Sequence, residues 1–322
     1  MAGNQQLPET IVLGPPHVFQ THADAFSSRF RLLKPWESPL PLAQFLRAQA
    51  QNTRAALCAG FFPLPATVLQ DLPSLGLVVT TSAGLDHIDL AECRRRGVAV
   101  AYAADIFSAD VADLAVGLLL DVMRRIGAAD RFVRNGLWPE KGIYPLGYRL
   151  GGKRVGIVGL GNIGLEVAKR LEPFGCRISY HSRNKKPSIP YTFYPDILKL
   201  AVESDALVIC CALTEQTRHL INRDVLLALG KEGFIVNIAR GPVIDEKELV
   251  ACLQAGEIGG AGLDVLENEP RVPNEFLELD NVVVTPHVGV YTGESCEKMF
   301  EIVWGNLEAF FDNKPLITPV ME

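Results

Sequence analysis

The chain has 322 residues, 48% of them hydrophobic and 21% charged, which suits two domains with buried cores and excludes a disordered or fibrous chain. Its net charge of −6 argues against a nucleic-acid partner, because such partners usually require a clustered basic face. The seven cysteines are scattered without a CxxC pair, and no apolar run approaches the ~20 residues that span a bilayer. We therefore expect a cytoplasmic protein with no disulfide framework, no metal site and no membrane segment.

The N-terminal part of the chain alternates between short apolar runs and helix-like segments. The runs predict strands at residues 10–13, 54–59, 77–81 and 98–100, with helices at 40–50 and 89–96 between them. This alternation is typical of a parallel α/β sheet. Gly84 directly follows one of these strands, and ligands bind at that carboxyl edge of such sheets.

The pattern changes after residue 108. Apolar residues at three- and four-residue intervals predict a long amphipathic helix from about 109 to 125, with a pattern that can be extended to 134. Residues 136–152 are rich in glycine, proline and aromatic residues and predict a loop. Its aromatic residues could contact a second copy of the chain, or pack on their own domain.

The segment Lys153–Gly164, KRVGIVGLGNIG, is the most informative in the chain. It predicts a buried strand at 155–158, a glycine turn, a helix at 163–174 and a second strand at 177–181. Gly159 would allow the sharp turn, Gly161 would let the backbone approach a pyrophosphate, and Gly164 would let the helix pack on the strand. Ordinary turns share this glycine spacing, but the order of elements favours a dinucleotide site.

The second strand indicates which dinucleotide binds. An acidic residue about 20 positions after the glycines normally accepts hydrogen bonds from the ribose, and here the strand runs into YHSRNKK. Ser182, Arg183 and the following lysines suit a 2′-phosphate, so we expect NADP(H) to be preferred, with NAD(H) possible. The alternative is that these basic residues only solvate an exposed loop.

The C-terminal half continues the alternation. We expect strands at 206–210, 233–237, 260–264 and 281–284, and helices at 222–229, 245–255 and 293–312. Arg240, Glu269 and His287 each follow a predicted strand. Any one of them could be an ordinary surface residue, but the strand ends of a doubly wound sheet gather along one edge, where the three could meet.

These segments together resemble the D-isomer-specific 2-hydroxyacid dehydrogenases, and within that family the plant cytosolic reductases of hydroxypyruvate, glyoxylate and 4-hydroxyphenylpyruvate. The matching segments occur in family order: TSAGLDHIDL, SADVADLAVGLLL, GLGNIG, ISYHSRNKKP, NIARGPVIDEKEL, GGAGLDVLENEP and VVTPHVG. The resemblance implies that Arg240 binds the substrate carboxylate, that His287 is the general acid, and that Glu269 pairs with its imidazole.

The resemblance also implies the remaining contacts. Substrate contacts are expected from Ala83, Gly84 and Arg240. Cofactor contacts are expected from Gly159, Leu160, Gly161, Asn162, Ile163, Ser182, Arg183, Asn184, Cys211, Thr217, Ile238, Ala239, Arg240 and Asp264, the last accepting from the nicotinamide carboxamide.

The implied architecture is two Rossmann-like or flavodoxin-like parallel-sheet domains. Residues 1–104, completed by 289–322, would form the substrate-binding domain, and 105–288 the inserted NADP-binding domain. The expected partners are a small 2-oxo acid and a second copy of the chain in a homodimer.

Two positions depart from the family pattern, and two other functions stay open. Asn162 stands where an arginine is frequent, which leaves the pyrophosphate to backbone amides, and Val290 stands where a small hydroxyl residue is common, which favours an aromatic substrate.

A nucleotide-sensing interaction protein of the corepressor type is the alternative function. A formate- or phosphite-type dehydrogenase of the same superfamily is disfavoured by the phosphate-binding pattern and by Glu269 with His287.

Overall fold

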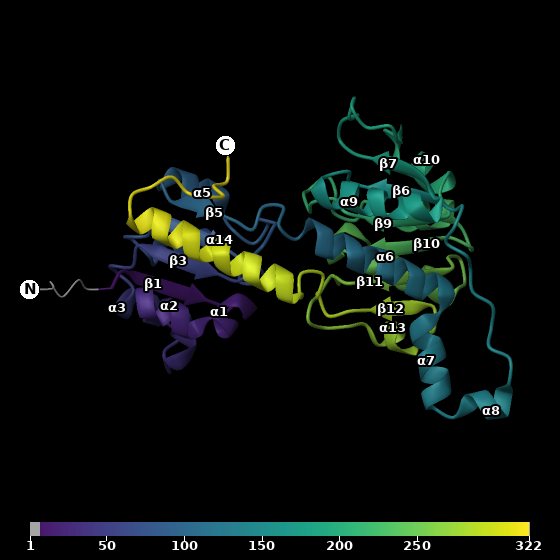
Figure 1. Cartoon of the computed structure of the whole chain (residues 1–322), viewed down its shortest axis with the longest axis horizontal. Helices are drawn as coiled ribbons and strands as arrows, with labels where there is room; N and C mark the ends of the chain where they lie inside the picture. Colours follow the sequence, from purple (N-terminus) through teal and green to yellow (C-terminus); the bar gives the residue numbers. More distant parts are fainter. Residues whose placement is uncertain (1–6, 322) are drawn as a thin grey trace, which may run out of the picture. The chain divides into compact units, whose positions relative to one another are not determined.

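The computed structural model describes residues 7–321, and its strands form two separate parallel sheets (Figure 1). Within the described residues, one unit runs to Phe107 and resumes at Tyr291, and the other spans Ser108–Val290. Each sheet belongs to one unit, so each unit is described by itself.

The first unit is built on a five-stranded sheet with the order β2-β1-β3-β4-β5. Every neighbouring pair is parallel, and the central strands β3 and β4 are buried throughout, as expected for a sheet covered on both faces. The strands are β1 (Glu9–Leu13), β2 (Arg31–Leu33), β3 (Ala55–Cys58), β4 (Leu77–Thr80) and β5 (Ala99–Ala101).

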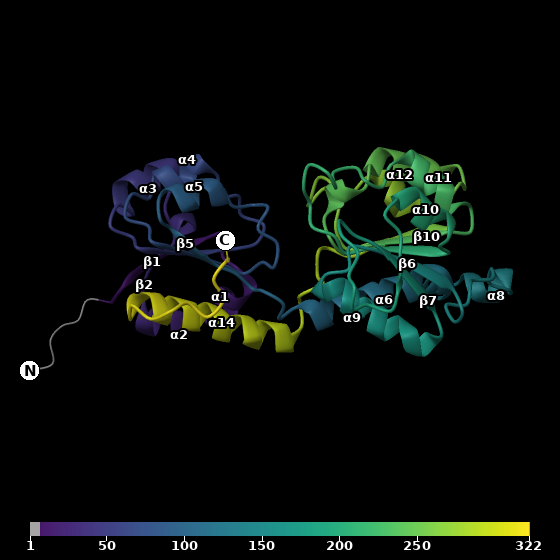
Figure 2. The ribbon, with the colours of Figure 1, turned by 90° about the horizontal axis from the view of Figure 1, so that it is seen from above.

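Helices cover both faces of this sheet (Figure 2). One face carries α1 (His17–Thr21), α2 (Ala23–Arg29) and α14 (Gly293–Phe311), and the other carries α3 (Leu42–Gln49), α4 (Ala66–Gln70) and α5 (Leu90–Arg95). The 3-10 turn η1 (Pro35–Glu37) follows β2. The C-terminal helix packs on α2 through aromatic rings, with the Phe26 and Phe300 centroids 5.6 Å apart. This contact joins the two ends of the chain in one core.

The second unit is built on a seven-stranded parallel sheet with the order β12-β11-β10-β9-β6-β7-β8. The chain runs outward from β6 to β7 and β8, then returns to β9 beside β6 and continues the other way. The carboxyl ends of β6 and β9 therefore form a topological switch point, where ligands bind in such sheets. The strands are β6 (Arg154–Val158), β7 (Arg177–His181), β8 (Thr192–Phe193), β9 (Ala206–Ile209), β10 (Phe234–Asn237), β11 (Gly260–Leu263) and β12 (Val282–Val284).

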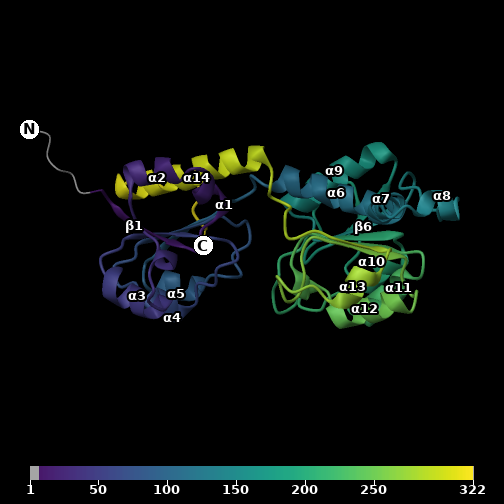
Figure 3. The ribbon, with the colours of Figure 1, turned by 90° about the horizontal axis from the view of Figure 1, so that it is seen from below.

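Two layers of helices enclose the second sheet (Figure 3). One layer contains α6 (Ser108–Arg124) and α9 (Asn162–Leu171), and the other α10 (Ile197–Val202), α11 (Arg223–Leu229), α12 (Glu246–Gln254) and α13 (Asn274–Glu278). Helix α6 lies directly on β11, because a Cβ on Gly260 or Gly262 would meet Val122 or Leu118. The 3-10 turns are η2 (Glu172–Phe174) and η3 (Gly241–Val243).

The structure corrects the predicted elements around residue 125. The helix expected from about 109 to 125 is α6, but the pattern that extends to 134 belongs to a separate helix, α7 (Ile126–Arg134), because Arg125 adopts a left-handed conformation at φ +58°. Asp121 stabilises the break by accepting a 2.7 Å hydrogen bond from the Gly127 N–H. The loop expected at 136–152 contains a short helix, α8 (Leu137–Lys141). Between residues 7 and 321, no helix has the length and apolar composition needed to cross a bilayer.

Candidate active site

The glycine turn after β6 is shaped by close backbone packing. Gly159 has φ +94°, and a Cβ there would lie 2.6 Å from the backbone of Cys211. The Gly159 N–H donates to the carbonyl of His181 over 2.8 Å, and a Cβ on Gly164 would overlap the Gly159 carbonyl. Side chains at 159 and 164 are therefore excluded, as expected for the sharp turn at Gly159 and for the packing of the helix on the strand at Gly164.

Gly161 differs from its two neighbours because a Cβ there would meet nothing within 4 Å. It is also the N-cap of α9 and supplies no side-chain hydrogen bond to the first helical N–H groups. An open backbone beside uncapped N–H groups suits an anion such as a pyrophosphate. The turn thus fits a dinucleotide, with Leu160, Gly161, Asn162 and Ile163 available to hold its phosphates.

The turn after β7 has the features expected for the ribose end of a dinucleotide. The Ser182 hydroxyl donates to the Asn184 carbonyl over 2.7 Å, and the Lys186 N–H donates to the buried Tyr180 hydroxyl over 2.8 Å. These bonds fix the turn while Arg183 stays exposed, and the sequence has no acidic residue from 177 to 193. The turn can therefore receive a phosphate without charge repulsion.

The expected adenosine contacts lie at the adjacent strand end. Cys211 packs on Gly159, and the Thr217 hydroxyl donates 2.7 Å to the Ala212 carbonyl and accepts 2.7 Å from the Thr214 N–H. Thr217 thereby shapes the 212–217 loop. Its direct contact with a cofactor stays a prediction.

The acid–base pair of the site is present in the structure. His287 Nδ1 lies 2.8 Å from Glu269 Oε2, and Glu269 Oε1 accepts 3.0 Å from the Leu266 N–H. Both side chains are partly exposed, at 45% for His287 and 36% for Glu269, so the imidazole can reach a bound molecule while it stays braced. The prediction that these two residues meet although 18 positions apart agrees with this geometry.

Glu269 is held in its ionised form by its surroundings. Burial raises the pKa of this carboxyl, but the hydrogen bond and charge of His287 outweigh that effect, together with the Leu266 N–H and the charge of Arg240. The net pKa is below the usual value, so Glu269 is a carboxylate near neutral pH. It can therefore stabilise a protonated His287.

Arg240 is positioned by the end of β10. Asn237, fully buried, accepts 3.0 Å from the Ala239 N–H and donates 3.0 Å to the Arg240 carbonyl. One guanidinium N–H of Arg240 donates 2.8 Å to the Ala239 carbonyl. Asn237 was not among the residues predicted from the sequence, although a polar residue that ends an apolar strand is a signal for a turn with such hydrogen bonds.

Asp264 organises the loop that carries His287. Its buried carboxylate accepts from the Thr285 hydroxyl at 2.6 Å and from the N–H groups of Val288 and Gly289 at 2.8 and 3.0 Å. Its carbonyl accepts 2.9 Å from the His287 N–H, which holds His287 at φ +54°. The structure thus gives Asp264 a positioning role, and its expected bond to a carboxamide stays a prediction.

Ile238 and Ala239 are almost fully buried beside Asn237, consistent with walls of a nicotinamide pocket. Ala83 and Gly84 lie in a partly exposed loop after β4 in the first unit.

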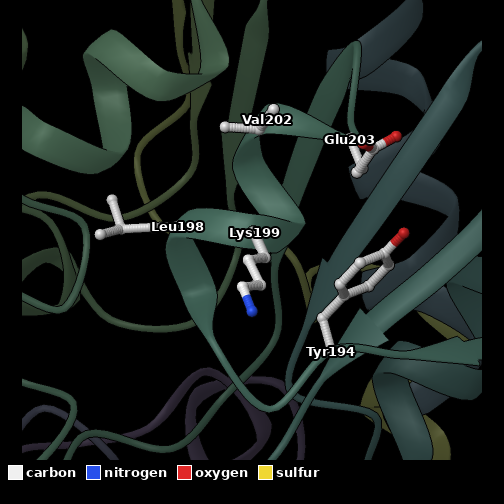
Figure 4. A pocket seen from close by; sticks show the side chains of 5 residues that line it. All are labelled: Tyr194, Leu198, Lys199, Val202 and Glu203. Atoms are coloured by element: carbon white, nitrogen blue, oxygen red, sulfur yellow. The ribbon is translucent and has the colours of Figure 1, made fainter.

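A surface pocket of about 280 Å³ lies elsewhere on the second unit, lined by Tyr194, Leu198, Lys199, Val202 and Glu203 (Figure 4). None of its lining residues is a predicted site residue.

The doubly wound sheet, the glycine turn and the braced histidine define a dinucleotide-dependent oxidoreductase. The family model for "D-isomer specific 2-hydroxyacid dehydrogenase, NAD binding domain" matches residues 116–289. The chain belongs to the D-isomer-specific 2-hydroxyacid dehydrogenases. The expected family and fold class are thus confirmed.

Individual relatives extend over nearly the whole chain. A glyoxylate/hydroxypyruvate reductase of Arabidopsis thaliana is 51% identical over 322 residues, covering 99% of both chains. A hydroxyphenylpyruvate reductase of Plectranthus scutellarioides is 49% identical over 293 residues, 91% of this chain and 93% of that protein. An NADPH-dependent glyoxylate/hydroxypyruvate reductase from Sinorhizobium meliloti, solved in complex with NADP and malonate, has a TM-score of 0.90 at 34% identity, covering 98% and 97% of the two chains.

Proposed function

We propose that this protein reduces a small 2-oxo acid to the D-2-hydroxy acid with NADPH. Glyoxylate, hydroxypyruvate and 4-hydroxyphenylpyruvate are the candidate substrates, because relatives about 50% identical carry those names. The observation that carries the proposal is the 2.8 Å contact between His287 and the Glu269 carboxylate. The positive charge of Arg240 also lowers the pKa of this carboxylate.

The proposed mechanism assigns one task to each of these residues. The reduced nicotinamide, when bound, supplies the hydride that the substrate C2 receives. His287 uses Nδ1 on Glu269, which leaves Nε2 to donate a proton to the forming alkoxide. Arg240 binds the substrate carboxylate through its guanidinium group and polarises the 2-oxo group. The amides of Ala83 and Gly84 are proposed as further contacts for the substrate carboxylate.

The proposed preference for NADPH depends on the turn after β7. Ser182, Arg183 and Asn184 would bind the 2′-phosphate, since the turn is braced and cationic and its sequence has no acidic residue to accept from a free ribose. A relative solved with NADP bound is consistent with this preference.

The direct test is a turnover assay. The purified protein is mixed with NADPH and, separately, with each of the three acids, and the loss of reduced-nicotinamide absorbance is followed. We expect turnover with at least one acid, and the ranking identifies the substrate. Absence of turnover with all three would refute the proposal. The alternative of a nucleotide-sensing interaction protein receives no support from the relatives.

We further propose that the protein is a cytosolic homodimer. The segment from α7 to residue 146, here called the arm, projects from the sheet of the second unit (Figure 1) and exposes Trp138, Ile143 and Leu146 by 62%, 94% and 92%. Apolar side chains this exposed are typical of a surface that a partner covers.

The proposed limits of the two domains remain residues 1–104 with 289–322 for the substrate-binding domain and 105–288 for the NADP-binding domain.

A further inference from the structure

The loop after β11 offers two successive N–H groups to two different glutamates. The Leu266 N–H donates 3.0 Å to Glu269, and the Glu267 N–H donates 2.9 Å to Oε2 of Glu246, the first residue of α12. Each hydrogen bond restricts the rotation of the peptide plane that carries its N–H. The orientation of Leu266, and with it one anchor of Glu269, is thus tied to α12.

The same loop is pressed against the Arg240 turn. Gly241 lies so close to the Leu266–Glu267 peptide that a Cβ at 241 would overlap it. The Gly241 backbone and the carboxylates of Glu246 and Glu269 therefore contact the two peptide groups on either side of Leu266. Of these, only Glu246 is a side chain outside the proposed chemistry.

We infer that Glu246 is a positioning residue for the general-acid pair. Its carboxylate holds the Glu267 N–H and thereby keeps the Leu266 N–H directed at Glu269, which braces His287. Since the effect is measured through catalysis by His287, the inference rests on the proposed function. Displacements of about 1 Å in such a site can cost up to a hundredfold in rate.

Glu246 lies among other carboxylates and is partly buried. Burial raises the pKa of Glu246, the Glu267 N–H opposes that effect, and the carboxylates of Glu267 and Glu269 raise the pKa further. Glu267 is itself bonded to His219 Nε2 over 2.9 Å, and His219 Nδ1 lies 3.7 Å from Asp245. The hydrogen bond from the Glu267 N–H is thus the interaction that stabilises this carboxylate, where burial and the neighbouring carboxylates oppose its ionisation.

The test compares four variants in the turnover assay. Glu246→Ala removes the acceptor, Glu246→Asp withdraws it by one methylene, and Glu246→Gln keeps a carbonyl oxygen at the same reach. Glu248→Ala is the matched control, because Glu248 lies on the same helix and pairs with Arg223 at 3.3 Å. We expect kcat to fall about tenfold or more for Ala and Asp, with the KM for NADPH unchanged, and Gln and the control to stay within about threefold of the wild type.

The pH profile and amide exchange separate positioning from general destabilisation. For Glu246→Ala or Glu246→Asp we expect the basic limb of kcat to move to lower pH, because a poorly held Glu269 stabilises the protonated His287 less. Amide hydrogen exchange at Leu266 and Glu267 should accelerate in these two variants and not in the control.

The outcomes distinguish the two proposals. Unchanged exchange at both amides, or an unchanged pH limb with normal kcat in the folded Asp variant, overturns the positioning role of Glu246. A Gln variant as slow as Ala also overturns it, because the effect would then follow charge and not the hydrogen bond. Exchange is measured without substrate, so a wild type that turns over none of the acids refutes only the proposed function.

Discussion

At the scale of single residues, the site depends on a carboxylate that acts in two directions. Glu269 accepts from the Leu266 N–H with one oxygen and from His287 with the other, so the backbone fixes the carboxylate and the carboxylate fixes the imidazole. Its lowered pKa keeps it charged in the range in which His287 must carry a proton. The carboxylate is therefore placed to accept the Nδ1 proton, which leaves Nε2 of the imidazole for a substrate.

Replacing this carboxylate should change the pH dependence of the reaction. In Glu269→Gln we expect the basic limb of the reduction rate to move down by about 1 pH unit or more, because the imidazolium loses its counter-charge. The pH profile of kcat/KM measures this, with the exposed Glu275→Gln on α13 as the control. A limb that stays in place would contradict the assigned role.

The same carboxylate should contribute to stability in a predictable pH range. Because folding lowers the pKa of Glu269, its stabilisation is present above the unfolded pKa and is lost as the pH falls through the folded one. Urea unfolding of wild type and Glu269→Gln should therefore differ most near neutral pH and converge in acid. Equal differences at both ends would show that the pair adds no charge-dependent stability.

The cofactor preference depends on one exposed cation. In Arg183→Asp we expect the KM for NADPH to rise about a hundredfold and that for NADH to change little, since a phosphate loses a charge-assisted donor. Arg177→Asp, with the same charge change at the other end of β7, is the control. An equal loss for both cofactors would contradict 2′-phosphate recognition.

At the scale of elements, the catalytic turns pack backbone to backbone. The Arg240 turn and the Glu269 loop meet at Gly241, where no side chain fits. The contact therefore blocks any closer approach of the two turns. This contact explains how residues from different strand ends keep a fixed relation.

A methyl group at Gly241 tests that contact. We expect Gly241→Ala to lower the free energy of unfolding by about 1–3 kcal/mol through overpacking, and to reduce kcat, because Arg240 and Glu269 are forced apart. Urea unfolding and turnover measure the two effects. Gly117→Ala on α6 is the control, since a Cβ there meets nothing within 4 Å. Normal stability and kcat in Gly241→Ala would show that the turns can separate freely.

At the scale of the whole molecule, the arm is the part that the fold of one chain does not explain. Ile143 and Leu146 are almost fully exposed, and Phe132 and Tyr144 pack their rings at 5.2 Å within the arm itself. Because the arm has internal packing and exposes apolar side chains, it could bind the same surface of a second copy of the chain in the proposed dimer.

Charging the arm should therefore separate the proposed dimer. We expect the double variant Ile143→Lys, Leu146→Lys to sediment as a monomer at concentrations at which the wild type is a dimer, with little change in Tm of the isolated chain. Leu277→Lys, at a site exposed by 70%, is the control. A wild type that sediments as a monomer would exclude this use of the arm.

The resemblance of several segments named the residues proposed for catalysis, whereas the α/β class and the glycine turn follow from the sequence alone. These features are local: buried parallel strands appear as short apolar runs, and the conformations at Gly159 and Gly164 require glycine wherever the turn occurs. Short elements, among them α1, α2, β2, β8, α10 and α13, were missed because so few residues carry little periodicity.

Which groups meet is a property of the folded chain. The break at Arg125 depends on a hydrogen bond between Asp121 and Gly127, and periodicity carries no information about it. The anchoring of Asp264 to the His287 loop and of Glu246 to the Glu267 N–H joins residues 21 to 25 positions apart. Such contacts depend on how strand ends align in the folded sheet, because a hydrogen bond needs a partner in space and a sequence specifies only neighbours along the chain.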